Sequence, residues 1–127
     1  LYIGLGVVLG HNFPFYLGFK GGKGVASTAG IIMALDIRIA VVCLAVFIIT
    51  VAITRYVSLG SIFVMIILIG MSHFFVKFSY GFGEGASPME FRLLTAAVGL
   101  LSIFMHRANI KRLLGGTENK IGKKVEK

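Results

Sequence analysis

Long apolar runs separated by short polar islands constrain this chain more than any other feature. Residues 39–54 contain no charge, and residues 57–76 and 91–105 form similar runs. Runs of this length suit helices that cross a bilayer, which need ~20 predominantly apolar residues with their flanks. Hydrophobic residues make up 57% of the chain and charged residues 14%, a composition that excludes an ordinary soluble domain and a disordered chain. The pattern predicts an all-α, polytopic membrane helix bundle.

Two further apolar segments complete the predicted bundle. Residues 1–10 lack the basic region of a signal peptide and are interpreted as the end of a preceding membrane helix. Residues 25–35 would span only ~16 Å as a helix, about half of the hydrocarbon core, so this segment is either a short membrane helix or a re-entrant half-helix. We expect about four membrane helices plus the end of a preceding one. Residues 1–127 then form a single membrane domain, the carboxy-terminal part of a longer protein.

The basic residues predict an orientation for this bundle. If all four segments cross, ten of the thirteen Lys and Arg residues lie on one side, and only Arg38, Lys77 and Arg92 lie on the other. Basic residues accumulate on the cytoplasmic side of membrane proteins, so the polar islands are expected to face the cytoplasm. If residues 25–35 only re-enter the membrane, the islands fall on opposite sides and the bias weakens.

The first polar island, residues 11–24, ends in a glycine-rich stretch. Gly21, Gly22 and Gly24 allow a close backbone approach to a ligand, and the following helix N-terminus favours an anion. Lys20 and Lys23 add full positive charges, so the stretch is interpreted as a phosphate cradle. It is not a Walker A loop, because the order of glycine, lysine and hydroxyl residues differs. The alternative is a flexible turn whose lysines lie at lipid headgroups.

The second polar island follows the last apolar run. His106, Asn109 and Arg112 are spaced by three residues, so they share one face of a helix. Glu118 is expected to pair with Lys20, Lys23 or Arg112 and to hold the glycine stretch against the tail. A solvated basic end of a membrane helix is the alternative. His11, which opens the first island, either contacts a ligand or anchors the chain at the interface, and the second role is preferred.

Three stretches together resemble a known family. They are GHNFPFYLGFKGGKGVAST (residues 10–28), RYVSL (residues 55–59) and HRANIKRLLGGTENKIG (residues 106–122). They are similar to signatures of the bacterial membrane acyltransferases that use acyl phosphate to acylate glycerol 3-phosphate, the PlsY family. The first signature of that family, roughly SGNIGATNxxR, has no match here. The chain therefore resembles the last four of seven helices, and we expect it to be inactive on its own.

The resemblance implies a function and a location. Acyl transfer from acyl phosphate to the glycerol 3-phosphate hydroxyl would give 1-acylglycerol 3-phosphate for phospholipid synthesis at the bacterial inner membrane. The implied partners are these two substrates, membrane lipid and the missing amino-terminal helices of the same protein, without nucleic acid. The resemblance implies no cofactor and no metal. The acyl chain would lie between helices, and a substrate phosphate oxygen would serve as the base.

The resemblance also implies residue roles. The catalytic residues would be His106, Asn109 and Lys23. The glycine stretch would hold the phosphate of the acyl donor. The substrate phosphates would be bound by Lys20, Gly21, Gly22, Gly24, Ser58 and Arg112. Structural support would come from Glu118 and His11.

Other classes of protein are weighed against this reading. An anion-binding transporter or channel fragment would also suit a half-helix entered through a glycine loop. Transport does not require the pattern of the second island, which argues against it. A non-catalytic scaffold would not need the glycines. An acyltransferase with a His-x-x-x-x-Asp motif is disfavoured, because Tyr16, Phe78 and Lys111 stand five residues after the three histidines.

Overall fold

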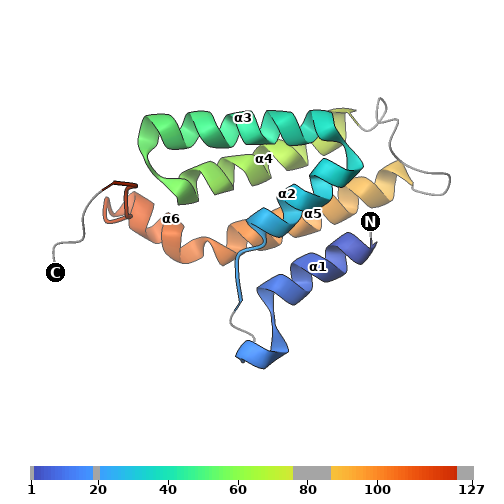
Figure 1. The fold of residues 1–127 in the computed structure, drawn as a ribbon, viewed down its shortest axis with the longest axis horizontal. Helices are drawn as coiled ribbons and strands as arrows, with labels where there is room; N and C mark the ends of the chain where they lie inside the picture. The colour runs from blue at the N-terminus through green and yellow to red at the C-terminus, as the bar shows by residue number, and fades with distance from the viewer. Residues whose placement is uncertain (1, 19–20, 76–86, 123–127) are drawn as a thin grey trace.

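The computed structural model describes residues 2–18, 21–75 and 87–122, and every element in these ranges is helical. This confirms the predicted all-α class. In chain order the elements are α1 (Tyr2–Asn12), the short 3₁₀ helix η1 (Phe15–Leu17), α2 (Val25–Leu35), α3 (Ile37–Thr54), α4 (Val57–Phe75), α5 (Pro88–Met105) and α6 (Arg107–Leu114) (Figure 1).

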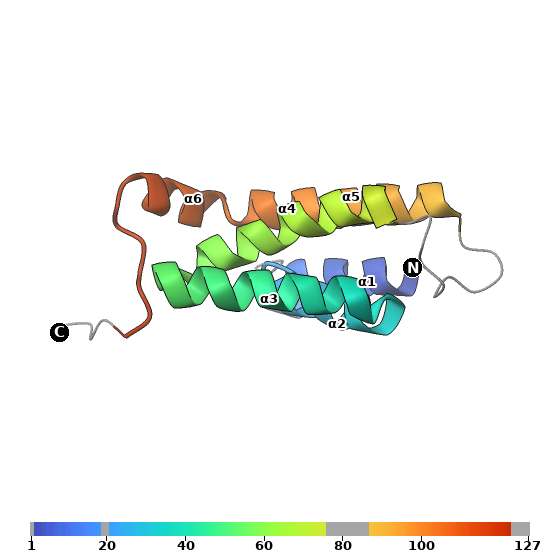
Figure 2. The same cartoon turned by 90° about the horizontal axis from the view of Figure 1, so that it is seen from above.

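Helix α4 occupies the centre of the arrangement. It packs most extensively against α3 and α5 and also touches α6, whereas α2 packs against α3 and α1. Seen from above, α5 and α6 lie on one side, α1, α2 and α3 lie on the other, and α4 slants between them (Figure 2). The core cluster is apolar except for the thiol of Cys43, and its buried members are Ile32, Ile39, Ala40, Cys43, Val64, Met65, Leu68 and Phe91.

Three described helices are long and apolar enough to cross a membrane. They are α3, residues 57–74 of α4, and α5. Helix α2 is apolar but has only 11 residues, as expected from the sequence. Three such helices support a multi-pass membrane protein, and a fourth crossing by α2 stays a prediction.

Polar side chains set the ends of the helices far from the polar islands. Asp36 separates α2 from α3, accepts a hydrogen bond from the backbone N–H of Arg38 at 3.0 Å and pairs with its guanidinium at 2.8 Å. Ser87 caps α5 by accepting from the N–H of Met89 at 3.2 Å, with Pro88 in the first helical turn. Capping by Ser87 and proline at the first position favour an earlier start than residue 91, which the apolar run alone suggests.

The last membrane helix does not continue straight into the polar island. His106 lies between α5 and α6, where its backbone N–H donates to the carbonyls of both Ser102 and Ile103, at 3.1 and 3.0 Å. Helix α6 resumes from the His106 carbonyl, which accepts from Ile110 at 2.9 Å. His106 and Asn109 nevertheless lie on one side as expected, because both side chains are buried and both line the same pocket.

Candidate functional site

The two polar islands meet at one end of the bundle. They line a cleft of about 600 Å³ that includes Gly22 and Lys23 from the first island and His106, Asn109 and Glu118 from the second. Ser58, at the start of α4, also lines the cleft. The sequence-based expectation that the islands share one side is confirmed. Lys20, which was expected to bind phosphate, lies outside the described residues.

Asn109 joins the glycine stretch to the carboxy-terminal tail. Its Oδ1 accepts a hydrogen bond from Lys23 Nζ at 2.6 Å, and its Nδ2 donates to Glu118 Oε1 at 2.8 Å. Because an ammonium can only donate and an ionised carboxylate can only accept, these two partners fix the orientation of the amide. Asn109 is only 6% exposed, and its amide holds the Lys23 ammonium and the Glu118 carboxylate in fixed positions relative to each other.

Glu118 is the acceptor on which several elements converge. Ser58 Oγ donates to its Oε1 at 2.8 Å, and Arg112 Nε donates to its Oε2 at 2.7 Å. The carboxylate side chain is only 7% exposed. Burial raises the pKa of Glu118, but hydrogen bonds from Asn109, Ser58 and Arg112, together with the charge of Arg112, outweigh it and hold the pKa below its ordinary value. Glu118 is therefore ionised at neutral pH.

These contacts refine the predicted roles of three residues. Of the two proposed partners of Glu118 that the structure describes, Arg112 pairs with it, while Lys23 bonds to Asn109 instead. Arg112 pairs with Glu118 through Nε and is not among the residues that line the cleft, so its expected contact with substrate phosphate stays a prediction. The Ser58 hydroxyl lines the cleft but already donates to Glu118, so it can offer a substrate only its lone pairs.

His106 is 2% exposed and lines the same cleft. Its Nδ1 lies 2.7 Å from the carbonyl of Ser102. Since a carbonyl can only accept, Nδ1 carries the proton, and the other ring nitrogen, Nε2, keeps its lone pair in the neutral form. Burial lowers the pKa of His106, the bond to Ser102 opposes this, the charge of Lys23 lowers the pKa further and that of Glu118 raises it. The net effect is a lowered pKa, so His106 is neutral at pH 7.

The glycine loop is attached to the end of α1. The N–H of Gly21 donates to the Asn12 carbonyl at 3.2 Å, and the N–H of Gly22 donates to the His11 carbonyl at 3.0 Å. These two N–H groups are therefore already paired within the chain, and phosphate binding by Gly21 and Gly22 stays a prediction. A phosphate at this loop would instead meet the N–H groups at the start of α2, which have no partner within the helix.

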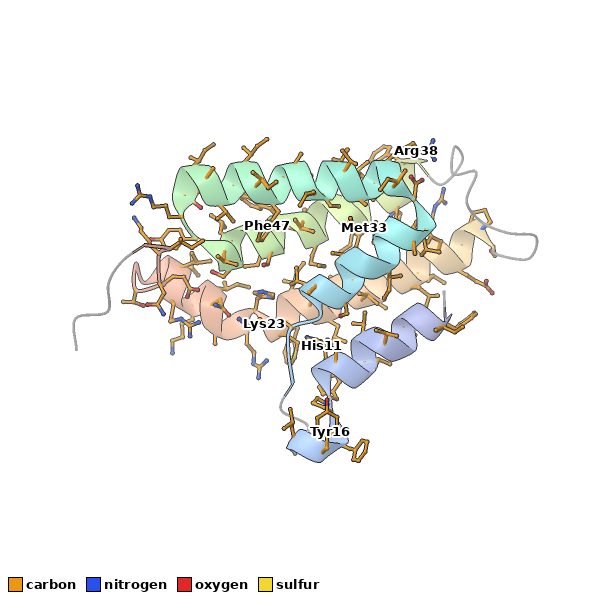
Figure 3. All side chains as sticks on the ribbon, in the orientation of Figure 1. His11, Tyr16, Lys23, Met33, Arg38 and Phe47 are labelled. Carbon is orange, nitrogen blue, oxygen red and sulfur yellow. The ribbon has the colours of Figure 1, made fainter. Side chains whose placement is uncertain are left out.

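Gly22 and Gly24 have distinct structural reasons to be glycine. A Cβ on Gly22 would overlap the imidazole of His11, which packs directly on the loop (labelled with Lys23 in Figure 3). Gly24 precedes α2 with φ of 77°, a conformation that favours glycine. His11 thus supports the loop through its carbonyl and its ring, and it also lines the cleft.

Ser102 belongs to the site, although the sequence did not single it out. Its Oγ donates to the carbonyl of Lys23 at 2.8 Å, and its own carbonyl accepts from His106. Ser102 precedes His106 by four residues, so the helical period places both on one face, which is the signal that could have found it. The buried serine fixes Lys23 and His106 relative to each other.

An apolar cavity of about 420 Å³ adjoins the polar cleft. It lies between α2, α3 and α4, and Met33 and Phe47 are among its lining residues (Figure 3). Four residues line both the cavity and the cleft, namely Val25, Ala26, Val57 and Ser61. A charged group in the cleft and an apolar chain in the cavity can therefore belong to one molecule.

Fold and site together define a multi-pass membrane protein with a basic, glycine-lined cleft at one end of its helix bundle. The family profile described as glycerol-3-phosphate acyltransferase matches residues 1–116. The chain belongs to this family.

Individual relatives agree with this membership. A glycerol-3-phosphate acyltransferase of Clostridioides difficile is 51% identical over 120 residues, which cover 94% of this chain and 53% of that protein. One of Halalkalibacterium halodurans is 43% identical over 124 residues, covering 97% of this chain and 57% of that protein. The chain thus spans about half the length of the curated relatives it matches.

Two solved structures have the same fold. Both are crystal structures of PlsY, an integral membrane glycerol 3-phosphate acyltransferase. The glycerol 3-phosphate form matches with a TM-score of 0.82 and 36% identity, over 95% of this chain and 56% of that one. The lysophosphatidic acid form matches with a TM-score of 0.80 and 36% identity, over 95% and 57%.

Proposed function

We propose that this chain contributes the greater part of an active site that transfers an acyl group from acyl phosphate to glycerol 3-phosphate. The observation that carries the proposal is the basic cleft that opens into an apolar cavity, with Lys23, Asn109 and Glu118 linked across it. The names of the relatives support the reaction, and the glycerol 3-phosphate and lysophosphatidic acid forms of PlsY support an acceptor and a product of this chemistry.

The geometry supports placing acyl phosphate across the cavity and the cleft, and glycerol 3-phosphate in the cleft alone. The acyl chain lies in the apolar cavity between α2, α3 and α4, and its phosphate lies at the start of α2 beside Lys23. Lys20, Gly22 and Gly24 belong to the same phosphate-binding loop. Glycerol 3-phosphate enters the cleft from water.

The chemical step needs no covalent enzyme intermediate. The acceptor hydroxyl oxygen attacks the acyl carbon, and the bond from that carbon to the phosphate oxygen breaks. Inorganic phosphate leaves with the bonding electrons and takes up the hydroxyl proton, which gives 1-acylglycerol 3-phosphate. Neutral His106 orients the hydroxyl through the Nε2 lone pair, and Asn109 and Lys23 stabilise developing negative charge.

The orientation and the complete assembly are also proposals. The cleft end carries Lys23, Arg55, Arg107, Lys111, Arg112 and Lys120, which supports a cytoplasmic position in the inner membrane of a bacterium. Because the matched relatives are about twice as long, we propose that the active enzyme contains helices beyond the 127 residues described by this sequence.

The test is a reconstitution of the full-length protein with acyl phosphate and glycerol 3-phosphate, with the lysophospholipid measured. Asn109→Ala should lower kcat by ~10²–10³, the usual effect of removing a preorganised donor. Lys111→Gln, an exposed change on the same helix away from the cleft, is the matched control and should retain activity. Absence of acyl transfer by the intact protein, or an equal loss in both variants, would overturn the proposal.

A further inference from the structure

The carboxy-terminal tail, residues 115–122, forms one wall of the polar cleft. Its residues 118–121 all line the cleft. The tail runs from α6 across the end of the bundle towards the turn between α3 and α4 (Figure 2). There the N–H of Ile121 donates to the carbonyl of Arg55 at 2.9 Å. Glu118 and Ile121 thus hold the tail at two points, with Lys120 between them.

Lys120 has a weakly held ammonium group at this wall. Its Nζ lies 5.2 Å from the centroid of the Tyr56 ring. The ion pairs of the described residues join Arg38 to Asp36 and Arg112 to Glu118, and Lys120 takes part in neither. Tyr56 is half-buried, whereas Lys120 itself is exposed. An aromatic ring attracts an ammonium group less strongly than a carboxylate or phosphate does, so the flexible lysine stem can leave the ring for a stronger partner.

Among the described residues, Lys120 is one of the few positively charged groups at the cleft that no carboxylate neutralises. Arg112 is neutralised by Glu118, and the lowered pKa of His106 leaves that residue uncharged. Two positive charges then remain among the described lining residues, Lys23 bonded to a neutral amide and Lys120 resting on a ring. A reaction that joins two phosphate-bearing substrates brings two anions into this space.

We propose that Lys120 is a further substrate-binding residue, which binds the phosphate of the water-soluble acceptor. The proposal rests on the acyl transfer proposed above. The donor phosphate is tied to a chain in the apolar cavity, whose lining begins at Val25, two residues after Lys23. Lys120 instead lies on the exposed tail beyond the ends of the membrane-spanning helices. Lys23 and Lys120 therefore serve different substrates.

The test measures Michaelis constants for both substrates in the full-length protein. Lys120→Gln should raise the KM for glycerol 3-phosphate by about tenfold or more, because a hydrogen bond between charged groups is lost. The KM for acyl phosphate should change less than about twofold, well below the effect of one charged hydrogen bond. Lys120→Arg keeps the charge and should retain most of the affinity. Lys111→Gln removes an equal charge outside the cleft and should leave both constants unchanged.

A binding measurement separates this proposal from the function on which it depends. Calorimetric titration with glycerol 3-phosphate needs no turnover, so it reports on Lys120 even if acyl transfer is absent. Weaker binding by Lys120→Gln but not by Lys111→Gln supports the role. Unchanged binding, an equal change in both KM values, or an equal effect of Lys111→Gln would overturn it.

Discussion

At the scale of single residues, the site depends on groups that can act only as hydrogen-bond donors or only as acceptors. Lys23 can only donate, the Ser102 carbonyl can only accept, and Glu118 is an ionised acceptor. Asn109 and His106 lie between these fixed partners, which determine the orientation of the amide and the tautomer of the imidazole. Substrates of the proposed reaction would therefore meet donors and acceptors that are already aligned, a condition that favours stabilisation of a transition state.

The lowered pKa of His106 predicts how stability depends on pH. An unfolded histidine takes up a proton near pH 6.5, whereas folded His106 resists it to lower pH. The folded state therefore loses stability as pH falls from about 6.5 towards the lowered pKa and loses nothing above that range. Thermal unfolding of the ligand-free protein between about pH 5.5 and 7.5 should show this decline. The His106→Gln variant should lack this decline in stability. The His73→Gln variant, changed at the end of α4 that lies away from the cleft, should retain it. An identical pH profile in the His106 variant would contradict the assignment.

The contact between Gly22 and His11 predicts that a second substitution restores activity lost at the glycine loop. Gly22→Ala should lower activity, because the new methyl group overlaps the imidazole of His11 and displaces the loop. His11→Ala makes room, so the double variant should recover part of the activity lost by Gly22→Ala alone. Gly30→Ala is the control, since a Cβ at this position of α2 meets nothing within 4 Å. Strictly additive losses from Gly22→Ala and His11→Ala would show that the steric contact is not the cause.

At the scale of elements, the sequence predicts what depends on local pattern. Hydropathy identifies α3, α4 and α5, and the distribution of basic residues along the sequence predicts that the two polar islands lie at the same end of the bundle. The interruption at His106 is not predictable in this way, because residues 107–114 contain neither glycine nor proline. It coincides with a side-chain bond from His106 to a carbonyl one turn earlier, on the buried side of the helix.

The rest of the site depends on contacts between distant segments. The N–H groups of Gly21 and Gly22 bind the end of α1, and the carbonyl of Lys23 binds Ser102, so the sequence around the glycines does not reveal their partners. Lys120 stands in a basic tail in which several lysines are equivalent by pattern. Only the packing of the tail on the α3–α4 turn distinguishes it.

The cavity between α2, α3 and α4 predicts control of acyl-chain length. Ala29→Phe should place an aromatic ring in this cavity and favour shorter acyl phosphates. Displacing two methylene groups at ~0.8 kcal/mol each should reduce the preference for a long over a short donor by about tenfold. Relative kcat/KM values for donors of different length measure this. Ala34→Phe on the same helix does not face the cavity and should keep the original preference. Equal shifts in both variants would argue against the cavity as the chain site.

At the scale of the whole molecule, the two ends of the bundle have different chemistry. One end gathers the glycine loop, the α3–α4 turn, α6 and the tail around the cleft. The other end holds the Asp36–Arg38 pair and the start of α5, apart from the cleft. Residues more than eighty positions apart, such as Lys23 and Asn109, become neighbours because α2, α4 and α5 all direct one end towards the same place.

The length of the relatives predicts that the 127-residue chain alone is a poor enzyme. No stretch of it matches the first signature of the family, which the resemblance credits with a serine and an arginine of the site. Losing even one preorganised group costs ~10²–10³ in rate, so turnover should be lower than that of a full-length relative by at least this factor. Purified chain and the Clostridioides difficile relative can be compared in the same lysophospholipid assay. Rates within about tenfold of each other would mean that these residues hold a complete site.

The residues shared by the cleft and the cavity determine where substrates of the proposed reaction would enter and where its products would leave. Val25, Ala26, Val57 and Ser61 form a boundary between the polar cleft and the apolar cavity. A reaction at that boundary lets a phosphate stay hydrated and a fatty chain stay in lipid throughout, which avoids the large desolvation penalty of moving a charge into the membrane. In the proposed reaction, the lysophospholipid would then pass into the bilayer and inorganic phosphate would return to water, each according to its own solubility.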